Sequence, residues 1–361
     1  MKKYIILLFG SILSRQLVNA QGCIVVRNIS GFGQYNLTDN AFTVSDWQLN
    51  INNRYFKAFR DYKGTADQKT AKQNESVVNS FSTDISIGRL LRNGWSLDLS
   101  MPFASNSRST TLEHRGPNTP RHTTHSFGIG DIRFVAYRWL LQPTVRQRAN
   151  IQLGLGVKFP TGAYNYQDFF YRSDSIKVLS AVNPSIQLGD GGTGIITEVN
   201  TFYFLNATKT LSFYGNFYYM ANPREQNGTA ITFGRTPPRI DSLANNIFLS
   251  VTDQYSVRAG INYSLKNWGL SFGMRKEGIP VEDIIGGSEG VRRAGYNFSL
   301  EPGIIYKFKK ASLYAYVPVI ANRETKQTLA DRFKTKYTGT YTLTPGGFGD
   351  YIVFIGALFK L

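Results

Sequence analysis

The feature that most constrains this chain is a two-residue alternation of apolar and polar side chains that recurs along most of its length. Near the start of the regular region, for example, Leu49 and Ile51 alternate with Gln48 and Asn50. Successive side chains of a β-strand point to opposite faces, so this pattern predicts strands with one apolar and one polar face. Twelve such segments occur, at residues 47–55, 81–88, 95–103, 126–141, 150–162, 193–205, 210–220, 255–264, 269–275, 296–308, 311–319 and 351–361.

The connections between these segments alternate in length. Short connections follow Leu91, Leu140, Leu205, Ser264 and Phe308, and the first contains Asn93-Gly94, a strong hairpin signal. Long connections fill residues 61–77, 104–124, 161–182, 221–253, 276–294 and 320–348. Short periplasmic turns and long outer loops are typical of membrane barrels. The predicted fold is therefore an all-β, transmembrane, antiparallel up-and-down β-barrel of about 12 strands, with both termini in the periplasm.

A soluble β-sandwich or barrel is the alternative fold. It also needs strands with one apolar face, but it does not call for a second face rich in glycine and charge along nearly every strand, nor for the alternating loop lengths. The last strand, residues 351–361, has one wholly apolar face with an aromatic residue near each end. A strand at the lipid boundary of a barrel has this character.

The N-terminus has the pattern of a secretory signal peptide. Lys2 and Lys3 precede an apolar run too short to cross a bilayer as a helix, and Ala20 ends a small-residue cleavage site. We expect a signal peptide over 1–20, a periplasmic segment over 21–46 and an outer-membrane barrel over 47–361. Cys23, the only cysteine, is interpreted either as a free thiol or as the lipidation site of a weak lipoprotein signal.

The formal net charge of +17 implies anionic surroundings. Because the chain is predicted to be exported, we expect no nucleic-acid partner. The predicted outer loops concentrate lysine and arginine, which favours contact with the phosphates of lipopolysaccharide and outer-membrane lipid.

Several segments together resemble a known family. They include "GIGDIRFVAYRWL", "LGLGVKFPTGAYN", "TDQYSVRAGINYS", "LYAYVPV" and, most specifically, the stretch from Glu277 to Phe308. These resemble the outer-membrane barrels named after the meta-pathway of phenol degradation, which are described as transporters. The resemblance covers most of residues 80–361 and implies an outer-membrane barrel that transports a small molecule.

Charged residues on the inward parity of the strands are the first candidate site. Charges facing lipid at the bilayer midplane would cost about 2–4 kcal/mol each, so these residues are expected to face the lumen. They are Asp84, Asp98, Asp131, Arg133, Lys158, Glu198, Arg258, Glu301 and Lys307. Two roles stay open: a salt-bridge network that fills a narrow lumen, or a polar path for a solute.

The loop over 278–295 is the second candidate site. It combines apolar residues with both signs of charge and a Gly-Gly pair, a composition that suits packing inside the barrel mouth. The hypothesis is a constriction loop that meets the inward Asp131, Arg258 and Glu301, formed by Ile279, Glu282, Asp283, Gly286, Gly287, Arg292 and Arg293. The alternative is a compact loop that packs on itself at the surface.

No motif requires a cofactor or a metal. His114, His122 and His125 fall in or beside one predicted outer loop, and their spacing is not that of metal ligands. We therefore predict that they lie in a solvated loop. No pairing of nucleophile and base is evident, so we expect a non-enzyme. The leading function is passive passage of a small solute. The alternative is a non-conducting structural barrel or a loop-binding platform with other envelope proteins.

Overall fold

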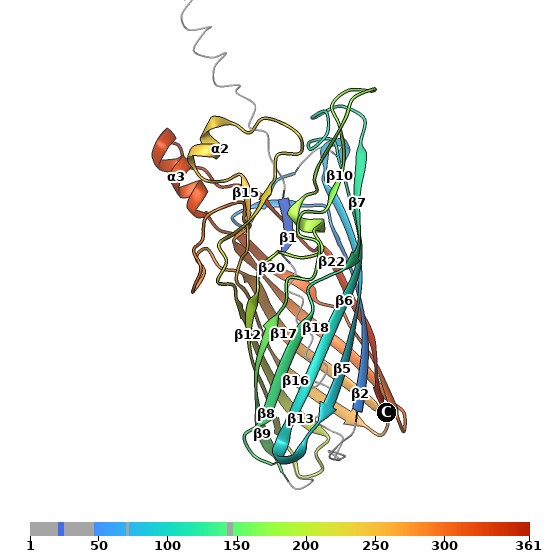
Figure 1. The fold of residues 1–361 in the computed structure, drawn as a ribbon. Coiled ribbons are helices and arrows are strands. Elements are labelled where there is room, and N and C mark those ends of the chain that lie inside the picture. The colour runs from blue at the N-terminus through green and yellow to red at the C-terminus, as the bar shows by residue number, and fades with distance from the viewer. Residues whose placement is uncertain (1–20, 25–46, 70–71, 143–146) are drawn as a thin grey trace, which may run out of the picture.

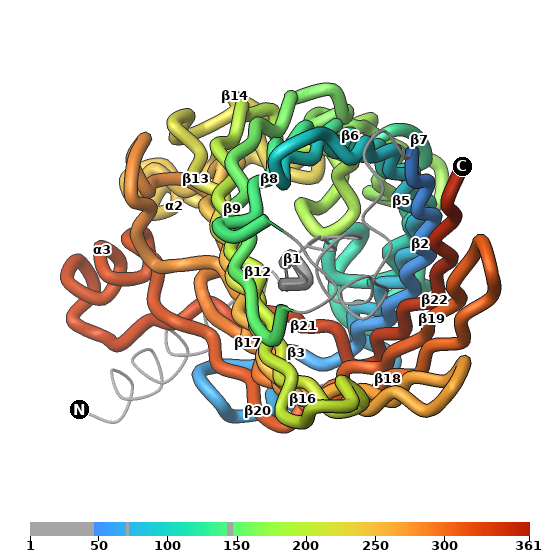
Figure 2. The backbone as a smooth tube through the Cα atoms, turned by 90° about the horizontal axis from the view of Figure 1, so that it is seen from below, coloured from blue at the N-terminus to red at the C-terminus, as the bar shows by residue number. Residues whose placement is uncertain are grey.

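The computed structural model describes residues 21–24, 47–69, 72–142 and 147–361, which form a closed β-barrel with a crown of loops at one end (Figure 1). The wall is a 14-stranded antiparallel sheet, and the pairing of β17 with β18 closes it (Figure 2). Its members are β2(Trp47–Ala58), β5(Val77–Leu90), β6(Trp95–Thr110), β7(His122–Ile129), β8(Arg133–Trp139), β9(Ala149–Lys158), β12(Gly194–Phe204), β13(Leu211–Ala221), β16(Gln254–Leu265), β17(Trp268–Ile279), β18(Gly295–Lys307), β19(Ala311–Tyr316), β20(Val319–Thr325) and β22(Tyr351–Lys360).

The barrel is twelve strands around, as predicted. Two of its twelve strands are each broken into two pieces: β7 and β8 both pair with β6, and β19 and β20 both pair with β18. The last strand, β22, pairs with β2 along nearly its full length and with β19 on its other side. The C-terminal stretch is therefore part of the wall between the first and the eleventh strand.

The barrel is polar inside and apolar outside, which excludes the soluble sandwich. Asn52 and Glu198 are buried in the lumen at 0% and 4% exposure, whereas Leu155 and Phe272 are exposed on the outer face at 65% and 58%. Water would make this distribution unfavourable, because apolar surface would stay solvated while polar groups were buried. Lipid makes it favourable. None of the helices in the described ranges is long and apolar enough to cross a membrane.

Aromatic side chains lie on the outer face toward both ends of the barrel. Trp47, Trp95 and Trp268 lie beside the short turns, and Arg89 and Arg138 stack over the first two at 5.1 and 5.2 Å. Tyr55 and Tyr351 lie at the opposite strand ends. Aromatic residues at both boundaries of an apolar belt mark the interfaces of a membrane barrel.

The long connections all lie at one end and carry short elements of their own (Figure 1). These elements are β3(Asp61–Lys63), β4(Ala66–Asp67), η1(Lys72–Asn74), β10(Gln167–Tyr171), β11(Lys177–Ala181), η3(Pro184–Ile186), β14(Gln226–Ala230), α2(Arg239–Leu243), β15(Phe248–Ser250), α3(Leu329–Thr338) and β21(Gly346–Phe348). At the other end, the predicted hairpin at Asn93-Gly94 is the short turn η2(Arg92–Gly94), with positive φ at both residues. The predicted loop over 104–124 is shorter than expected, because β6 continues to Thr110.

The single strand predicted over 126–141 is interrupted. Thr124 and Ser126 face inward before the interruption, whereas Val135 and Tyr137 face inward after it, so the parity shifts by one residue. Residues 130–132 turn aside and bond to the start of the next loop, where Thr161 Oγ1 donates to Gly130 O at 2.9 Å. Alternation alone cannot reveal such a shift, because each half keeps a regular period.

The N-terminal segment differs from the sequence expectation where it is described. The strand β1(Gln21–Ile24) pairs in parallel with β21, which also pairs with β3 in the loops at the crown. The sequence predicted a periplasmic segment over 21–46, but this strand lies at the end of the barrel opposite the start of β2. The predicted signal peptide and residues 25–46 lie outside the described residues.

Candidate functional site: the barrel lumen

The structure places the predicted lumen charges on the inward face of the wall. Asp84, Lys158, Glu198, Arg258 and Glu301 are buried, while Asp98, Asp131, Arg133 and Lys307 are half-buried. Arg258 and Glu301 belong to an ionic cluster on β16, β17 and β18, and Asp131, Arg133 and Lys158 lie in or beside the outer ends of β8 and β9. Asp84, Asp98 and Glu198 lie on β5, β6 and β12, and Lys307 is the last residue of β18.

The ionic cluster is centred on Glu301. Its carboxylate pairs with Arg258, whose Nε lies 3.1 Å from Oε1, and with Arg275, whose Nη1 lies 3.4 Å from Oε2. Arg275 also pairs with Glu277 at 2.7 Å. All four side chains are nearly inaccessible to solvent. The sequence analysis missed Glu277, because it ended the strand at residue 275, and it left out Arg275 although that residue lies within the predicted strand. Continuing the inward parity of Ser271 and Gly273 two steps further would have found both.

Aromatic rings complete this part of the lumen. Arg258 lies over the ring of Tyr316 at 5.1 Å, and Arg275 lies over the ring of Phe354 at 5.3 Å. Toward the mouth, Phe56, Val182 and Ile186 belong to the same buried apolar cluster as these two rings. Side chains therefore fill much of the lumen, as expected for a barrel of this size.

A cavity of about 190 Å³ remains inside the barrel on the other side. Its lining includes residues of five wall strands, of the turn between β7 and β8 and of the loop after β9, among them Arg54, Phe56, Pro102, Asp131, Arg133, Lys158, Leu188, Asp190, Tyr218 and Met220. Arg54 was not among the predicted residues, although its place on the polar parity of the first strand would have identified it.

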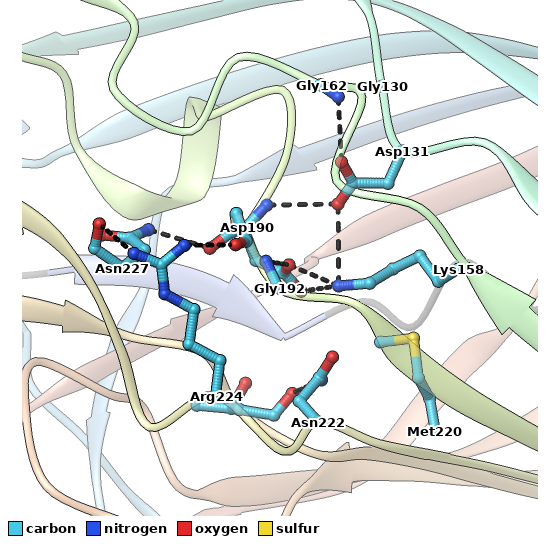
Figure 3. Close-up of polar contacts among 12 residues, drawn as sticks. Gly130, Asp131, Lys158, Gly162, Asp190, Gly192, Met220, Asn222, Arg224 and Asn227 are labelled. Atoms are coloured by element: carbon cyan, nitrogen blue, oxygen red, sulfur yellow. Dashed lines mark hydrogen bonds and ion pairs between the residues drawn. The ribbon is translucent and has the colours of Figure 1, made fainter. Parts of the chain in front are cut away.

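Asp131 and Lys158 line one wall of this cavity and contact the loop after β9 (Figure 3). The Asp131 carboxylate accepts hydrogen bonds from the backbone N–H of Gly162 at 2.9 Å and of Asp190 at 3.2 Å. Lys158 Nζ lies 3.7 Å from Asp131 Oδ2 and is also bonded to the Asp190 carboxylate. Both ends of the loop after β9 are thus tied to residues at the outer end of the wall. Asp131 faces inward beside Arg133, the orientation expected from the sequence.

The loop over 280–294 packs mainly against its neighbour loop, residues 222–253. Val291 belongs to a buried cluster with Leu249, Phe233 and Phe170. Arg292 pairs with Asp283 inside the same loop, and both side chains are fully buried. Burial raises the pKa of Asp283, a shift that the ion pair with Arg292 opposes.

The remaining residues of the proposed constriction contact other loops. Ile279 packs against Tyr62 and Phe348, and Glu282 pairs with Arg332 at 2.7 Å. Gly286 and Gly287 have positive φ and lie against Pro223 and Glu225. Arg293 is buried, and burial lowers its pKa to about 10. Among the described contacts of this loop, none joins it to Asp131, Arg258 or Glu301.

Two of the three histidines, His114 and His122, differ from the solvated loop that was expected, whereas His125 is exposed. His114 is buried, and its Nδ1 accepts a hydrogen bond from Tyr171 N at 3.1 Å. His122 stacks on the Tyr171 ring at 3.8 Å. In the described ranges no three His, Cys, Asp or Glu residues are placed to hold a metal ion. The histidines instead pack the long loop between β6 and β7 against β10.

Comparisons with solved structures agree with this architecture. The COG4313 outer-membrane channel from Pseudomonas putida F1 matches with a TM-score of 0.57 and 11% identity, over 89% of this chain and 97% of that one. A Pseudomonas aeruginosa FadL homologue matches with a TM-score of 0.41 and 7% identity, over 94% and 99% of the two chains. No protein-family model and no curated protein matches the sequence. At these identities the likeness concerns the fold. Fold and apolar outer belt together show an outer-membrane β-barrel.

Proposed function

We propose that this protein is a passive outer-membrane channel for a small solute. The observation that carries the proposal is the space inside the barrel, where Arg54, Arg133 and Lys158 face a cavity of about 190 Å³. Charged groups along such a space offer a path to a solute that the surrounding lipid excludes. The sequence resemblance to the meta-pathway transporter barrels and the structural likeness to an outer-membrane channel support the same function, and no enzymatic activity is proposed.

Conductance in planar bilayers tests this proposal. The purified protein should produce discrete conductance steps, and Lys158→Gln with Arg54→Gln should shift the reversal potential toward cation preference, because two fixed positive charges leave the path. Lys360→Gln, at the last residue of β22 and away from the cavity, is the matched control. A folded protein that gives no conductance above the bare bilayer would contradict the proposal.

A structural, non-conducting barrel is the alternative, and the filled half of the lumen favours it. The cluster around Glu301 and the rings of Tyr316 and Phe354 occupy space that an open pore would leave empty. In that case the loops would be the working surface, for lipopolysaccharide or for other envelope proteins. Recovery of a stable complex from the native membrane, together with absent conductance, would select this alternative.

The constriction loop stays a proposal with a sharper test. Replacing residues 284–289 by a short Gly-Ser linker removes the tip and keeps the buried Asp283–Arg292 pair and Val291. If the tip narrows the mouth, single-channel conductance rises while assembly is unchanged. A shortened protein that conducts like the parent would show that the loop serves only to pack its neighbours.

A further inference from the structure

The helix α3 lies outside the outline of the barrel. Figure 1 shows it beside the crown of loops, and Figure 2, which looks at the molecule from below, shows it beyond the ring of wall strands. A helix in this position lies over the membrane that surrounds the barrel and not over the lumen. The proposed channel therefore gives this helix no role.

The helix begins close to the outer boundary of the apolar belt. On β17 the outward side chain of Met274 is exposed and apolar, and the next outward side chain, Lys276, is charged. Lys276 Nζ lies 4.3 Å from the ring of Tyr296, so a cation and an aromatic ring mark the boundary on this side. β20 ends at Thr325, which pairs with the residue before Tyr296, and α3 begins four residues later. Four residues span at most about 14 Å, so the start of α3 stays near the lipid headgroups.

Both ends of α3 are capped, and one of its faces is held to the crown. Thr328 Oγ1 accepts a hydrogen bond from Asp331 N at 3.1 Å, and Asp331 Oδ2 accepts one from Thr328 N at 3.2 Å, which makes a capping box. Gly339 ends the helix in the left-handed conformation, with φ 70°. Asp331 is buried, and Lys334 on the same face pairs with Asp241 of α2. The orientation of the helix is therefore fixed.

The opposite face carries two aromatic and two basic side chains, which we call the anchor stripe: Arg332, Phe333, Lys336 and Tyr337. Their spacing places them together on one side of the helix. Phe333 and Tyr337 are exposed at 39% and 62%, and their rings stack 5.9 Å apart. Tyr341, just after the helix, is exposed at 69%. Aromatic rings beside cations are typical of a helix that lies in a membrane interface.

The charge of this segment suits an anionic lipid surface. Residues 326–341 contain four basic residues and one acidic residue, Asp331, which the capping box uses. Arg332 pairs with Glu282 of a neighbouring loop, whereas Lys336 belongs to no ion pair among the described residues. A second copy of the chain would bring the same excess of positive charge to this face. Anionic lipid is therefore the better occupant.

We propose that α3 is an interfacial anchor, and that its anchor stripe lies in the headgroup layer of the outer leaflet. The rings of Phe333 and Tyr337 contact the lipid at the boundary of the acyl chains, and Lys336 binds a phosphate of lipopolysaccharide. The anchor does not depend on conduction, so it applies to a channel and to a structural barrel alike.

Fluorescence quenching by lipid tests the anchor. In a Cys23→Ser background, Thr340→Cys carries a small fluorophore beside the anchor stripe without replacing any member of it. Single copies of the full-length barrel are placed in nanodiscs of phosphatidylcholine with a headgroup nitroxide lipid, with or without lipopolysaccharide. The control is Asp174→Cys, at the tip of the β10–β11 hairpin, which rises above the crown in Figure 1. The label at residue 340 should be quenched more than the label at residue 174, and most strongly with lipopolysaccharide.

Two sets of variants separate the rings from the charge. Phe333→Ser with Tyr337→Ser should reduce the quenching at residue 340 toward that of the control in both kinds of nanodisc. Lys336→Gln should reduce it only where lipopolysaccharide is present, and Lys336→Arg should restore it. Lys310→Gln removes the same charge from a short turn at the other end of the barrel and should change nothing. Heat-modifiable migration on gels confirms that each variant is folded.

Three results would overturn the inference. Equal quenching at residues 340 and 174 in nanodiscs with lipopolysaccharide would mean that α3 stands in water. Equal quenching at residue 340 with and without lipopolysaccharide, unchanged by Lys336→Gln, would mean that no anionic lipid is bound. A spectral shift that appears only in nanodiscs with two copies of the protein would mean that the anchor stripe docks on a second copy. None of these results bears on conductance, so the proposed channel function stands or fails separately.

Discussion

Two sides of the barrel differ in the contacts that complete the wall and in what lies behind it in the lumen. Along β16, β17 and β18 the ladders are continuous, and behind them Arg258, Arg275 and Glu301 form buried ion pairs in the lumen. Beside β7 the ladder stops, residues 159–193 contact its edge through side chains, and a cavity lies behind. The continuous ladders thus lie beside the ionic cluster, and the edge of β7 lies on the side of the cavity.

This contrast predicts that the two sides differ in local stability. A buried ionic cluster is costly to assemble and strongly destabilising when one member is removed, so it fixes a single arrangement of side chains. Side-chain contacts over a strand edge can open locally at a cost far below global unfolding. We therefore expect the side with the ionic cluster to contribute more to stability than the side with the cavity.

The largest expected effect comes from breaking the ionic cluster. Glu301→Ala leaves Arg258 and Arg275 buried without their shared carboxylate and should destabilise the folded barrel by about 3–5 kcal/mol. The midpoint of urea unfolding of the purified barrel, followed by heat-modifiable migration on gels, measures the loss. A loss of only about 0–1 kcal/mol in the free energy of unfolding, as for an exposed ion pair, would show that the ionic cluster contributes no more to stability than a surface contact does.

Acid should act first on the side with the cavity. Burial, with the nearby charges of His122, Arg172 and Arg235, lowers the pKa of His114 to about 4, against a partial opposing effect of Asp168. Because the pKa of His114 is lower in the folded than in the unfolded protein, its neutral form favours the folded state at a pH above about 6.5. This contribution to stability is lost as the pH falls from about 6.5 toward 4. The loss should reach roughly 3 kcal/mol.

Hydrogen exchange in the loop over 111–121 and in β10 measures this effect. Exchange should accelerate between pH 6.5 and pH 4, after correction for the intrinsic rate, and His114→Gln should remove most of the pH dependence. The same acceleration in β17 and β18 would mean that acid loosens the barrel as a whole.

Removing the Asp131 carboxylate, which binds both ends of the loop after β9, should have a smaller, local effect. Asp131→Ala removes the acceptor for Gly162 N and Asp190 N, which should cost about 1–3 kcal/mol for the groups left unpaired. Faster hydrogen exchange at these two amides, with unchanged exchange in β16 and β18, is the expected result. Unchanged exchange at Gly162 and Asp190 would show that Asp131 does not hold the segment.

The smallest effect is expected at a solvent-exposed pair on the side with the ionic cluster. Arg332 and Glu282 join two outer loops at 2.7 Å, and each side chain is more than half exposed. Arg332→Ala should cost about 0–1 kcal/mol, and less at high salt. Urea unfolding at low and high ionic strength checks this. A loss comparable to that of Glu301→Ala would mean that the loops contribute to stability as much as the lumen does.

Much of the fold could be predicted from the sequence, because the signal for each strand is local. The pattern in Leu49, Asn50 and Ile51 repeats every two residues wherever a wall faces lipid on one side. The break between β7 and β8 was hidden, since each piece alternates regularly on its own. The packing of His114 was hidden too, because its partner, Tyr171, lies 57 residues away.

The sequence by itself determined the barrel, its strand number and the end that carries the long loops. These follow from alternation and from connection length, and both are properties of neighbouring residues. Only the tertiary structure decided how the charges pair: Glu301 bonds Arg258 across 43 residues and Arg275 across 26. It also decided that the chain after β9 crosses the edge of β7 and leaves a cavity behind it. Pairings of this kind depend on the register between distant strands and on the space that neighbouring side chains leave, and a period along one strand contains neither.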